Sequence, residues 1–139
     1  MTKPSAPKAR RATIETFRAG TFHPVAGEPV TFSAADVAAI AAAYDAARAP
    51  APVVVGHPSL DAPAYGWAAA FGVTGAGDDA RLTATVDLVP EFAAAVEAGH
   101  YKKISLSLFP PAHPANPTPG AWYPKHVGFL GAAAPAVTG

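Results

Sequence analysis

Short segments with the two-residue periodicity of β-strands recur along most of this 139-residue chain. Residues 12–18 alternate apolar and polar side chains, as in a strand that buries one face. Further strand-like runs lie at residues 51–55, 65–73, 80–88, 101–109 and 122–130. The Gly- and Asp-rich link 74–79 predicts a hairpin, whereas Gly20 and the stretch Pro24 to Pro29 are expected to form a turn region. In all, the pattern predicts about seven strands.

Two segments carry helix signals. We expect a helix from Ser33 to about Arg48, because Ser33 can cap its first turn and Pro50 would stop it. Its apolar stripe would consist of Val37, Ile40, Ala41 and Tyr44. Residues 90–98 predict a second helix that begins at a proline. Together the elements predict an α+β domain, with a mainly antiparallel β-sheet or small barrel and about two helices.

Composition excludes several classes of protein. The chain has no cysteine, which rules out disulfides, thiolate metal sites and a cysteine nucleophile. No apolar run approaches the ~20 residues that span a bilayer, so we expect no membrane partner. Nucleotide-binding glycine patterns are absent, and neither a cofactor nor a metal is expected.

Charged residues are unevenly distributed along the chain, although its formal net charge is zero. Residues 1–18 carry five Lys/Arg and one Glu, a net of +4, and the remainder carries five against nine, a net of −4. We interpret residues 1–11 as a flexible, solvated basic arm, and expect no nucleic-acid partner. Residues 12–131 would form one domain, followed by a tail at 132–139.

Serine and histidine are scarce, with five of each. Ser105 and Ser107 lie in an alternating run, so both should project from one face of a strand. His57 follows an apolar run and precedes a proline, and His126 lies in the last expected strand. A serine hydroxyl needs an adjacent imidazole to become a nucleophile. These residues can therefore form a Ser-His hydrolase or serve only structural roles. The absence of a Gly-x-Ser-x-Gly elbow argues against an α/β-hydrolase.

Four linked motifs carry a resemblance to a known family. They are VGHP at 55–58 with AYGW at 64–67, YKKISLS at 101–107, NPTPG at 116–120 and HVGFLG at 126–131. In this order they resemble the Mu-like prophage I proteins, over a region from about Ile14 to the C-terminus. Those proteins are regarded as phage head-maturation proteases with a scaffolding region downstream. Their protease part is similar to the prohead proteases and to herpesvirus assemblin, a Ser-His-His protease, so the resemblance implies an assemblin-like fold.

The resemblance implies a role for each matching residue. His57 corresponds to the first histidine and Ser105 to the nucleophile. Ser107 stands where the related proteases have a glycine, which makes it the alternative nucleophile. His126 corresponds to assemblin's second histidine, which would orient His57. Backbone N–H groups near Gly128 and Gly131 would form the oxyanion hole.

The resemblance further implies an endopeptidase that cleaves scaffold and capsid proteins, and itself, inside the procapsid in the bacterial host cytoplasm. The tail at 132–139 would lead to a scaffold region that this chain lacks. The proline-rich stretch 110–119 is expected to be a surface loop whose shortening spares folding. Three alternatives stay open: a non-catalytic assembly module of the same fold, a metal site built from His57, His113 and His126, and a homodimer instead of a monomer.

Overall fold

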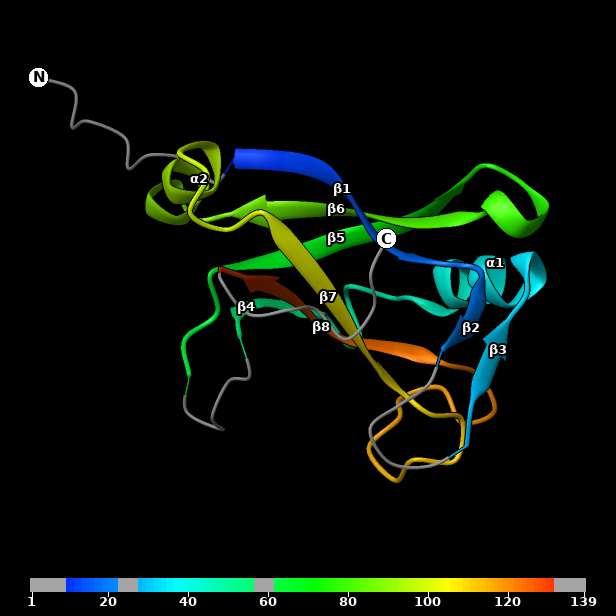
Figure 1. Ribbon diagram of the computed structural model, residues 1–139. Coiled ribbons are helices and arrows are strands. Elements are labelled where there is room, and N and C mark those ends of the chain that lie inside the picture. Colours follow the sequence, from blue (N-terminus) through cyan, green and yellow to red (C-terminus); the bar gives the residue numbers. More distant parts are fainter. Residues whose placement is uncertain (1–9, 23–27, 57–61, 132–139) are drawn as a thin grey trace, which may run out of the picture.

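The computed structural model describes residues 10–22, 28–56 and 62–131 (Figure 1). Eight strands and two α-helices lie in this part of the chain. The strands are β1 (Arg10–Arg18), β2 (Gly20–Phe22), β3 (Val30–Phe32), β4 (Pro52–Val55), β5 (Gly66–Thr74), β6 (Arg81–Leu88), β7 (Lys103–Phe109) and β8 (Tyr123–Leu130). The helices are α1 (Ala34–Ala43) and α2 (Pro90–Glu97), and a short 3-10 turn covers Gly77–Asp79.

Six of the strands form one curled sheet in the order β1-β6-β5-β4-β8-β7. All neighbours in this sheet are antiparallel except β4 and β8, which are parallel. The sheet curls until its two edge strands, β1 and β7, approach each other. Strands β2 and β3 form a separate two-stranded hairpin. The architecture is therefore a mixed fold with a curled, antiparallel-rich sheet, compatible with the α+β class that the sequence predicts.

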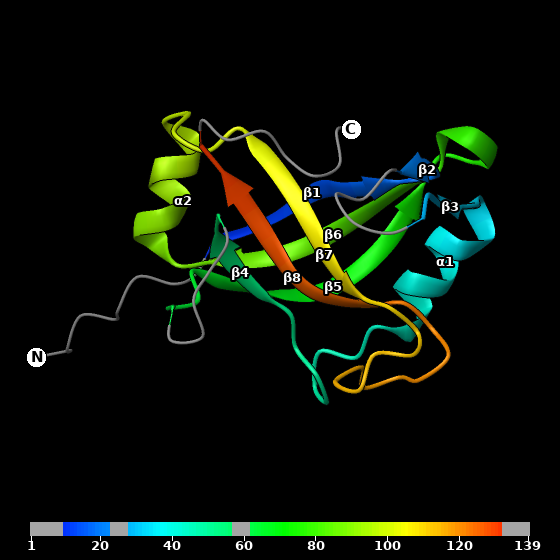
Figure 2. The ribbon, with the colours of Figure 1, turned by 60° about the horizontal axis from the view of Figure 1, so that its bottom comes forward.

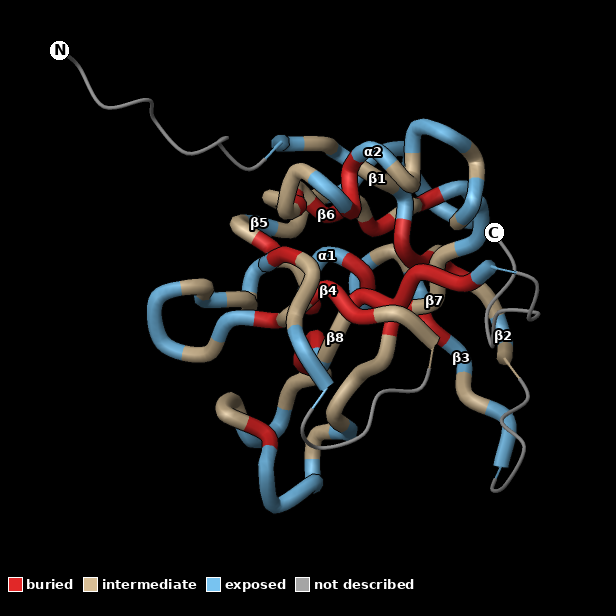
Figure 3. The backbone as a smooth tube through the Cα atoms, turned by 90° about the vertical axis from the view of Figure 1, so that its left-hand side faces the viewer, coloured by how far each residue is buried: buried red, intermediate tan, exposed pale blue. Residues whose placement is uncertain are grey.

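The inner face of the curled sheet carries the hydrophobic core. In β6 the side chains alternate strictly, and every second residue is buried: Leu82, Ala84, Val86 and Leu88. Strands β4, β7 and β8 add Val53, Leu106 and Val127 to the same cluster. Buried segments accordingly follow the strands, whereas the exposed ones concentrate in turns and loops (Figure 3). The two-residue periodicity of β6 thus places its apolar side chains on one side of the sheet.

The two helices lie at opposite ends of the curled sheet (Figure 2). Helix α1 buries Val37 and Ile40. Helix α2 buries Phe92, whose ring lies about 5 Å, centroid to centroid, from three other aromatic rings, those of Tyr65, Tyr101 and Phe129 (5.2 Å each). Each helix thus packs apolar side chains into the core at one end of the sheet.

Most expected elements are found within about two residues of their expected ends, the margin within which helix and strand boundaries are usually assigned. The β5–β6 hairpin is confirmed, and so is the cap of α1, where the Ser33 hydroxyl accepts from the Asp36 N–H and the Asp36 carboxylate accepts from the Ser33 N–H. Strand β1 begins at Arg10, so the last two residues of the expected basic arm pair with β6.

Two expectations are wrong. Helix α1 ends at Ala43 and does not reach Arg48. The Asp45 carboxylate accepts hydrogen bonds from the N–H groups of Ala47 and Arg48. These bonds replace the ones that the two N–H groups would make in a helix, so the helix ends before them. Gly20, expected in a turn, instead begins a strand, because Gly20–Phe22 pairs with Val30–Phe32. Most of the other expected turn, from Pro24, lies outside the described residues. No helix in the described ranges is long and apolar enough to span a membrane.

An ion pair attaches the edge strand β1 to β6. Arg11 Nε and Nη2 donate to the two carboxylate oxygens of Asp87, at 2.8 and 2.9 Å. These hydrogen bonds lower the pKa of Asp87 below its ordinary value of 3.8 and raise the pKa of Arg11. Both side chains are well exposed, so solvent screens the pair and its contribution to stability is small.

We predict that this contribution depends on pH. Because the folded-state pKa of Asp87 is depressed, the stabilisation is fully present above the unfolded-state pKa and is lost as pH falls through the folded-state value. Asp87→Asn should therefore lower the free energy of unfolding slightly at pH 7, and this effect should shrink as pH falls below the ordinary Asp pKa and vanish once the folded-state carboxyl is protonated. Urea denaturation across this pH range measures the difference. Asp78→Asn, in the exposed β5–β6 turn, is the control, and an Asp87→Asn effect that persisted at low pH would contradict the prediction.

Candidate active site

The two candidate serines project from the same face of β7. Leu106 is buried in the core cluster, and Ile104 and Leu108 pack against that cluster. Ser105 and Ser107 alternate with these residues, so both lie on the opposite, outer face of the strand. Both serines are half-buried. The alternation expected from the sequence is thus present in the structure.

His126 lies on the same face, on the neighbouring strand. The antiparallel register pairs Ser107 with His126 and Ser105 with Gly128. Directly paired residues have Cβ atoms about 4.5–5.5 Å apart, and diagonal neighbours about 7–8 Å apart. His126 is therefore a direct neighbour of Ser107 and a diagonal neighbour of Ser105. Its Nδ1 atom is buried.

A β-bulge follows immediately after the Ser107–His126 pair. Leu108 pairs with Pro124, so Lys125 is an extra residue on β8. The Lys125 ammonium lies 5.6 Å from the centroid of the Phe109 ring. Bulges bend a strand and re-aim its side chains, and they are common next to active sites. This one changes the local twist beside Ser107 and His126.

Strand β4 brings a third segment of the chain to this face. Val54 pairs with Gly128 in the parallel ladder, and the Gly56 N–H donates to the Phe129 carbonyl at 3.0 Å. Gly56 has φ +63°, a left-handed conformation that favours glycine. A Cβ atom added to Gly128 would lie 3.2 Å from the Ser105 carbonyl oxygen and 3.7 Å from the Gly56 carbonyl oxygen. The end of β4 thus lies beside Gly128, on the side of β8 opposite Ser105.

His57 is the residue after Gly56 in the sequence, and it lies outside the described residues. Its distances to Ser105 and His126 are therefore not described, and its role stays a prediction. The structure does bring together Ser105, Ser107, His126 and Gly128 from two paired strands, and it places the last described residue before His57 beside them.

The two candidate oxyanion glycines occupy different positions. Gly128 lies in the interior of β8 with β4 on one side and β7 on the other. Backbone N–H groups of a strand paired on both sides point at its neighbours, and Gly128 itself is buried. Gly131 directly follows β8 and is exposed. The oxyanion role of both stays a prediction.

No group of three or more His, Asp or Glu side chains that could hold a metal ion occurs among the described residues. His113, a member of the alternative metal site, lies in the proline-rich loop. Its Nδ1 accepts from the Ala115 N–H at 3.0 Å, and its ring lies 5.2 Å from the ring of Phe109. His113 thus serves the local structure of the loop, and the described residues supply no donor set for a metal.

The sequence did not reveal the residues that hold the loop between β7 and β8. Asn116 is buried, and its side-chain NH₂ donates to the carbonyls of Pro110 and Ala121 at 2.9 and 2.7 Å, while its Oδ1 accepts from the Thr118 N–H at 2.7 Å. Prolines leave carbonyls without matching N–H groups, and Asn116 supplies the missing donors. An Asn between prolines is a turn signal, but its burial could not be read from the sequence.

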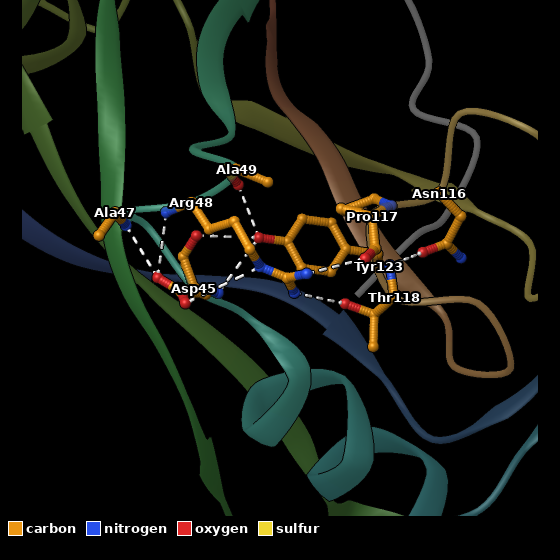
Figure 4. Close-up of polar contacts among 8 residues, drawn as sticks. All are labelled: Asp45, Ala47, Arg48, Ala49, Asn116, Pro117, Thr118 and Tyr123. Atoms are coloured by element: carbon orange, nitrogen blue, oxygen red, sulfur yellow. Dashed lines mark hydrogen bonds and ion pairs between the residues drawn. The ribbon is translucent and has the colours of Figure 1, made fainter.

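Two further residues attach this loop to the rest of the protein (Figure 4). The Arg48 guanidinium donates to the Pro117 carbonyl and to the Thr118 hydroxyl, both at 3.0 Å. The buried Tyr123 hydroxyl, at the start of β8, contacts backbone groups of Asp45 and Ala49. The loop is therefore fastened to the turn that follows α1.

No protein-family model, no curated protein and no solved structure matches this chain. The resemblance to the Mu-like prophage I proteins accordingly stays an expectation from the motifs alone. The fold is defined here only as a curled, antiparallel-rich sheet with two helices, and the function has to be argued from the geometry of the β7–β8 face.

We predict that Asn116→Ala destabilises the protein by about 1–3 kcal/mol, because it leaves buried carbonyls without donors. The free energy of unfolding in urea measures the loss. Asn116→Asp keeps the acceptor for the Thr118 N–H but removes the NH₂ donors, so it should not restore stability. If Asn116→Ala were as stable as the unmodified protein, the loop would be the passive connection that the sequence alone suggested.

Proposed function

We propose that this chain is the protease domain of a phage head-maturation system, a serine endopeptidase that cleaves scaffold and capsid proteins inside the procapsid, in the cytoplasm of a bacterial host. The proposal rests on one observation above all. Two serines and a histidine share one face of the β7–β8 pair, and the end of β4, which leads to His57, lies beside β8 at Gly128. The motif resemblance supplies the substrate class and the assemblin-like Ser-His-His assignment.

The arrangement suits acyl transfer. Ser105 Oγ would attack the carbonyl carbon of a peptide bond while His57 accepts the hydroxyl proton. The carbon–nitrogen bond then breaks, the same proton passes to the leaving amine, and an ester to Ser105 remains. Water attacks this ester with the imidazole again as base, which releases the carboxylic acid and restores the serine. His126 would orient His57 and stabilise its charged form.

Ser105 lies opposite Gly128, so no side chain on β8 directly faces its hydroxyl across the strand pair. The motif resemblance is what favours Ser105 as the nucleophile. Ser107 instead lies opposite the His126 imidazole. That direct pairing supports a second mechanism on the same face, in which His126 is the base and Ser107 the nucleophile. The two mechanisms require different serines, so substitutions separate them.

We predict that Ser105→Ala abolishes both labelling by a fluorophosphonate probe and cleavage of a purified scaffold protein, whereas Ser107→Ala retains them. Loss of a nucleophile typically removes several orders of magnitude in rate. The two serines are matched controls for each other, since both are half-buried on one face of one strand. The reverse result would identify Ser107 as the nucleophile. Absence of labelling and cleavage in the unmodified protein would favour a non-catalytic assembly module.

We predict that His126→Ala leaves weak, measurable cleavage and that His57→Ala leaves essentially none. An orienting residue contributes through placement and electrostatics, and its loss costs less than loss of the base. Values of kcat/KM for the two variants measure the difference. If His126→Ala were as inactive as His57→Ala, and Ser107→Ala inactive as well, the Ser107–His126 mechanism would hold.

A further inference from the structure

The Tyr123 hydroxyl is held by the backbone of the turn after α1. It lies 2.6 Å from the Ala49 carbonyl oxygen, 3.1 Å from the Asp45 nitrogen and 3.1 Å from the Asp45 carbonyl oxygen (Figure 4). A phenol has one hydrogen, so it donates over the shortest distance, to Ala49, and accepts from the Asp45 N–H. The ring is 1% exposed. The first residue of β8 is therefore fixed both by packing and by hydrogen bonds.

The turn that holds Tyr123 is itself rigid. The Asp45 carboxylate accepts from the N–H groups of Ala47 and Arg48 at 3.0 and 3.1 Å, and the Ala49 N–H donates to the Asp45 carbonyl at 2.9 Å. Helix α1, which leads into this turn, is anchored in the core by Val37 and Ile40. Tyr123 is thus attached to a fixed point outside the β7–β8 pair.

Only two residues separate Tyr123 from His126, and both belong to the bulge region. Tyr123 pairs with Phe109, Pro124 pairs with Leu108, and Lys125 is the extra residue. On the other side of the bulge, buried Val127 fixes which face His126 occupies. Tyr123 and Val127 are thus both held in place. The extra residue, Lys125, has to be accommodated between them, directly beside the Ser107–His126 pair.

We infer that Tyr123 is a positioning residue, whose hydroxyl fixes the bulge and thereby the orientation of His126 relative to Ser107 and Ser105. Without the hydroxyl, β8 can move relative to the turn after α1, and the extra residue can shift toward the loop. The local bend and twist at His126 then change, although its face does not. The expected effect of Tyr123 on catalysis rests on the proposed function. Its expected effect on the orientation of His126 does not.

Tyr44 provides a matched control. Its hydroxyl also makes two backbone hydrogen bonds, donating to the Ala68 carbonyl at 2.6 Å and accepting from the Ala51 N–H at 2.8 Å. Burial raises its pKa, and its ring lies 5.6 Å from that of Tyr123. Tyr44→Phe therefore removes the same group from the same neighbourhood, but it releases strands β4 and β5 from α1 and leaves β8 attached.

The experiment compares Tyr123→Phe with Tyr44→Phe. The first readout is the pair of His126 imidazole C–H signals in NMR spectra, assigned with His126→Gln, which reports on orientation whether or not the protein is a protease. We expect Tyr123→Phe to shift these signals and Tyr44→Phe to leave them in place, although both lower the free energy of unfolding. Unchanged His126 signals in Tyr123→Phe, or equal shifts in both variants, would overturn the inference.

The second readout is cleavage of the scaffold protein. We expect Tyr123→Phe to lower kcat by about 10- to 100-fold with little change in KM, since a misplacement of about 1 Å costs on this order. If Tyr123→Phe does not fold, Asp45→Ala takes its place, because it removes the exposed carboxylate that shapes the turn holding the Tyr123 hydroxyl. It should shift the His126 signals, Asp45→Asn should restore them in part, and unchanged signals in a folded Asp45→Ala would overturn the inference. Shifted signals in a protein without any cleavage would refute the proposed function and leave the inference intact.

Discussion

The pairing of β8 with two other strands is the contact on which the rest of the structure depends. On one side β8 runs parallel to β4, and on the other antiparallel to β7, so β7 joins the sheet only through it. Its inner face contributes Val127 and Phe129 to the core, and its outer face contributes His126. A parallel neighbour cannot be reached through a hairpin, so β8 has to find β4 across a long stretch of chain. We expect this non-local pairing to form late in folding.

The elements of the fold could largely be predicted from the sequence, because their signals are local. Alternating or continuous apolar runs identified the six strands of the curled sheet, and Ser33 identified the start of α1. The end of α1 could not be predicted, because it depends on the Asp45 side chain and on contacts of Tyr44 with Ala68 and Ala51. The β2–β3 hairpin was hidden by the glycine and prolines around it, which also suit a turn.

The candidate site could be predicted only in part, for a similar reason. That Ser105 and Ser107 share a face follows from the period of a strand, and the structure confirms it. Which residue lies opposite each serine depends on strand order and on a bulge, and neither leaves a local signal. The supporting roles of Asn116 and Tyr123 depend on burial and on distant backbone groups, so they too became visible only in the folded chain.

The approach of β1 to β7 affects the tendency of the protein to aggregate at high local concentration. A sheet edge offers a row of backbone donors and acceptors that can recruit a strand from another molecule, and natural proteins protect such edges with curvature and charge. Here the curl turns the two edges toward each other, and Arg10, Arg11 and Lys103 lie at the ends of the edge strands. A chain without net charge gains little from overall repulsion between its copies. Its resistance to edge-to-edge aggregation at high local concentration therefore depends on this geometry.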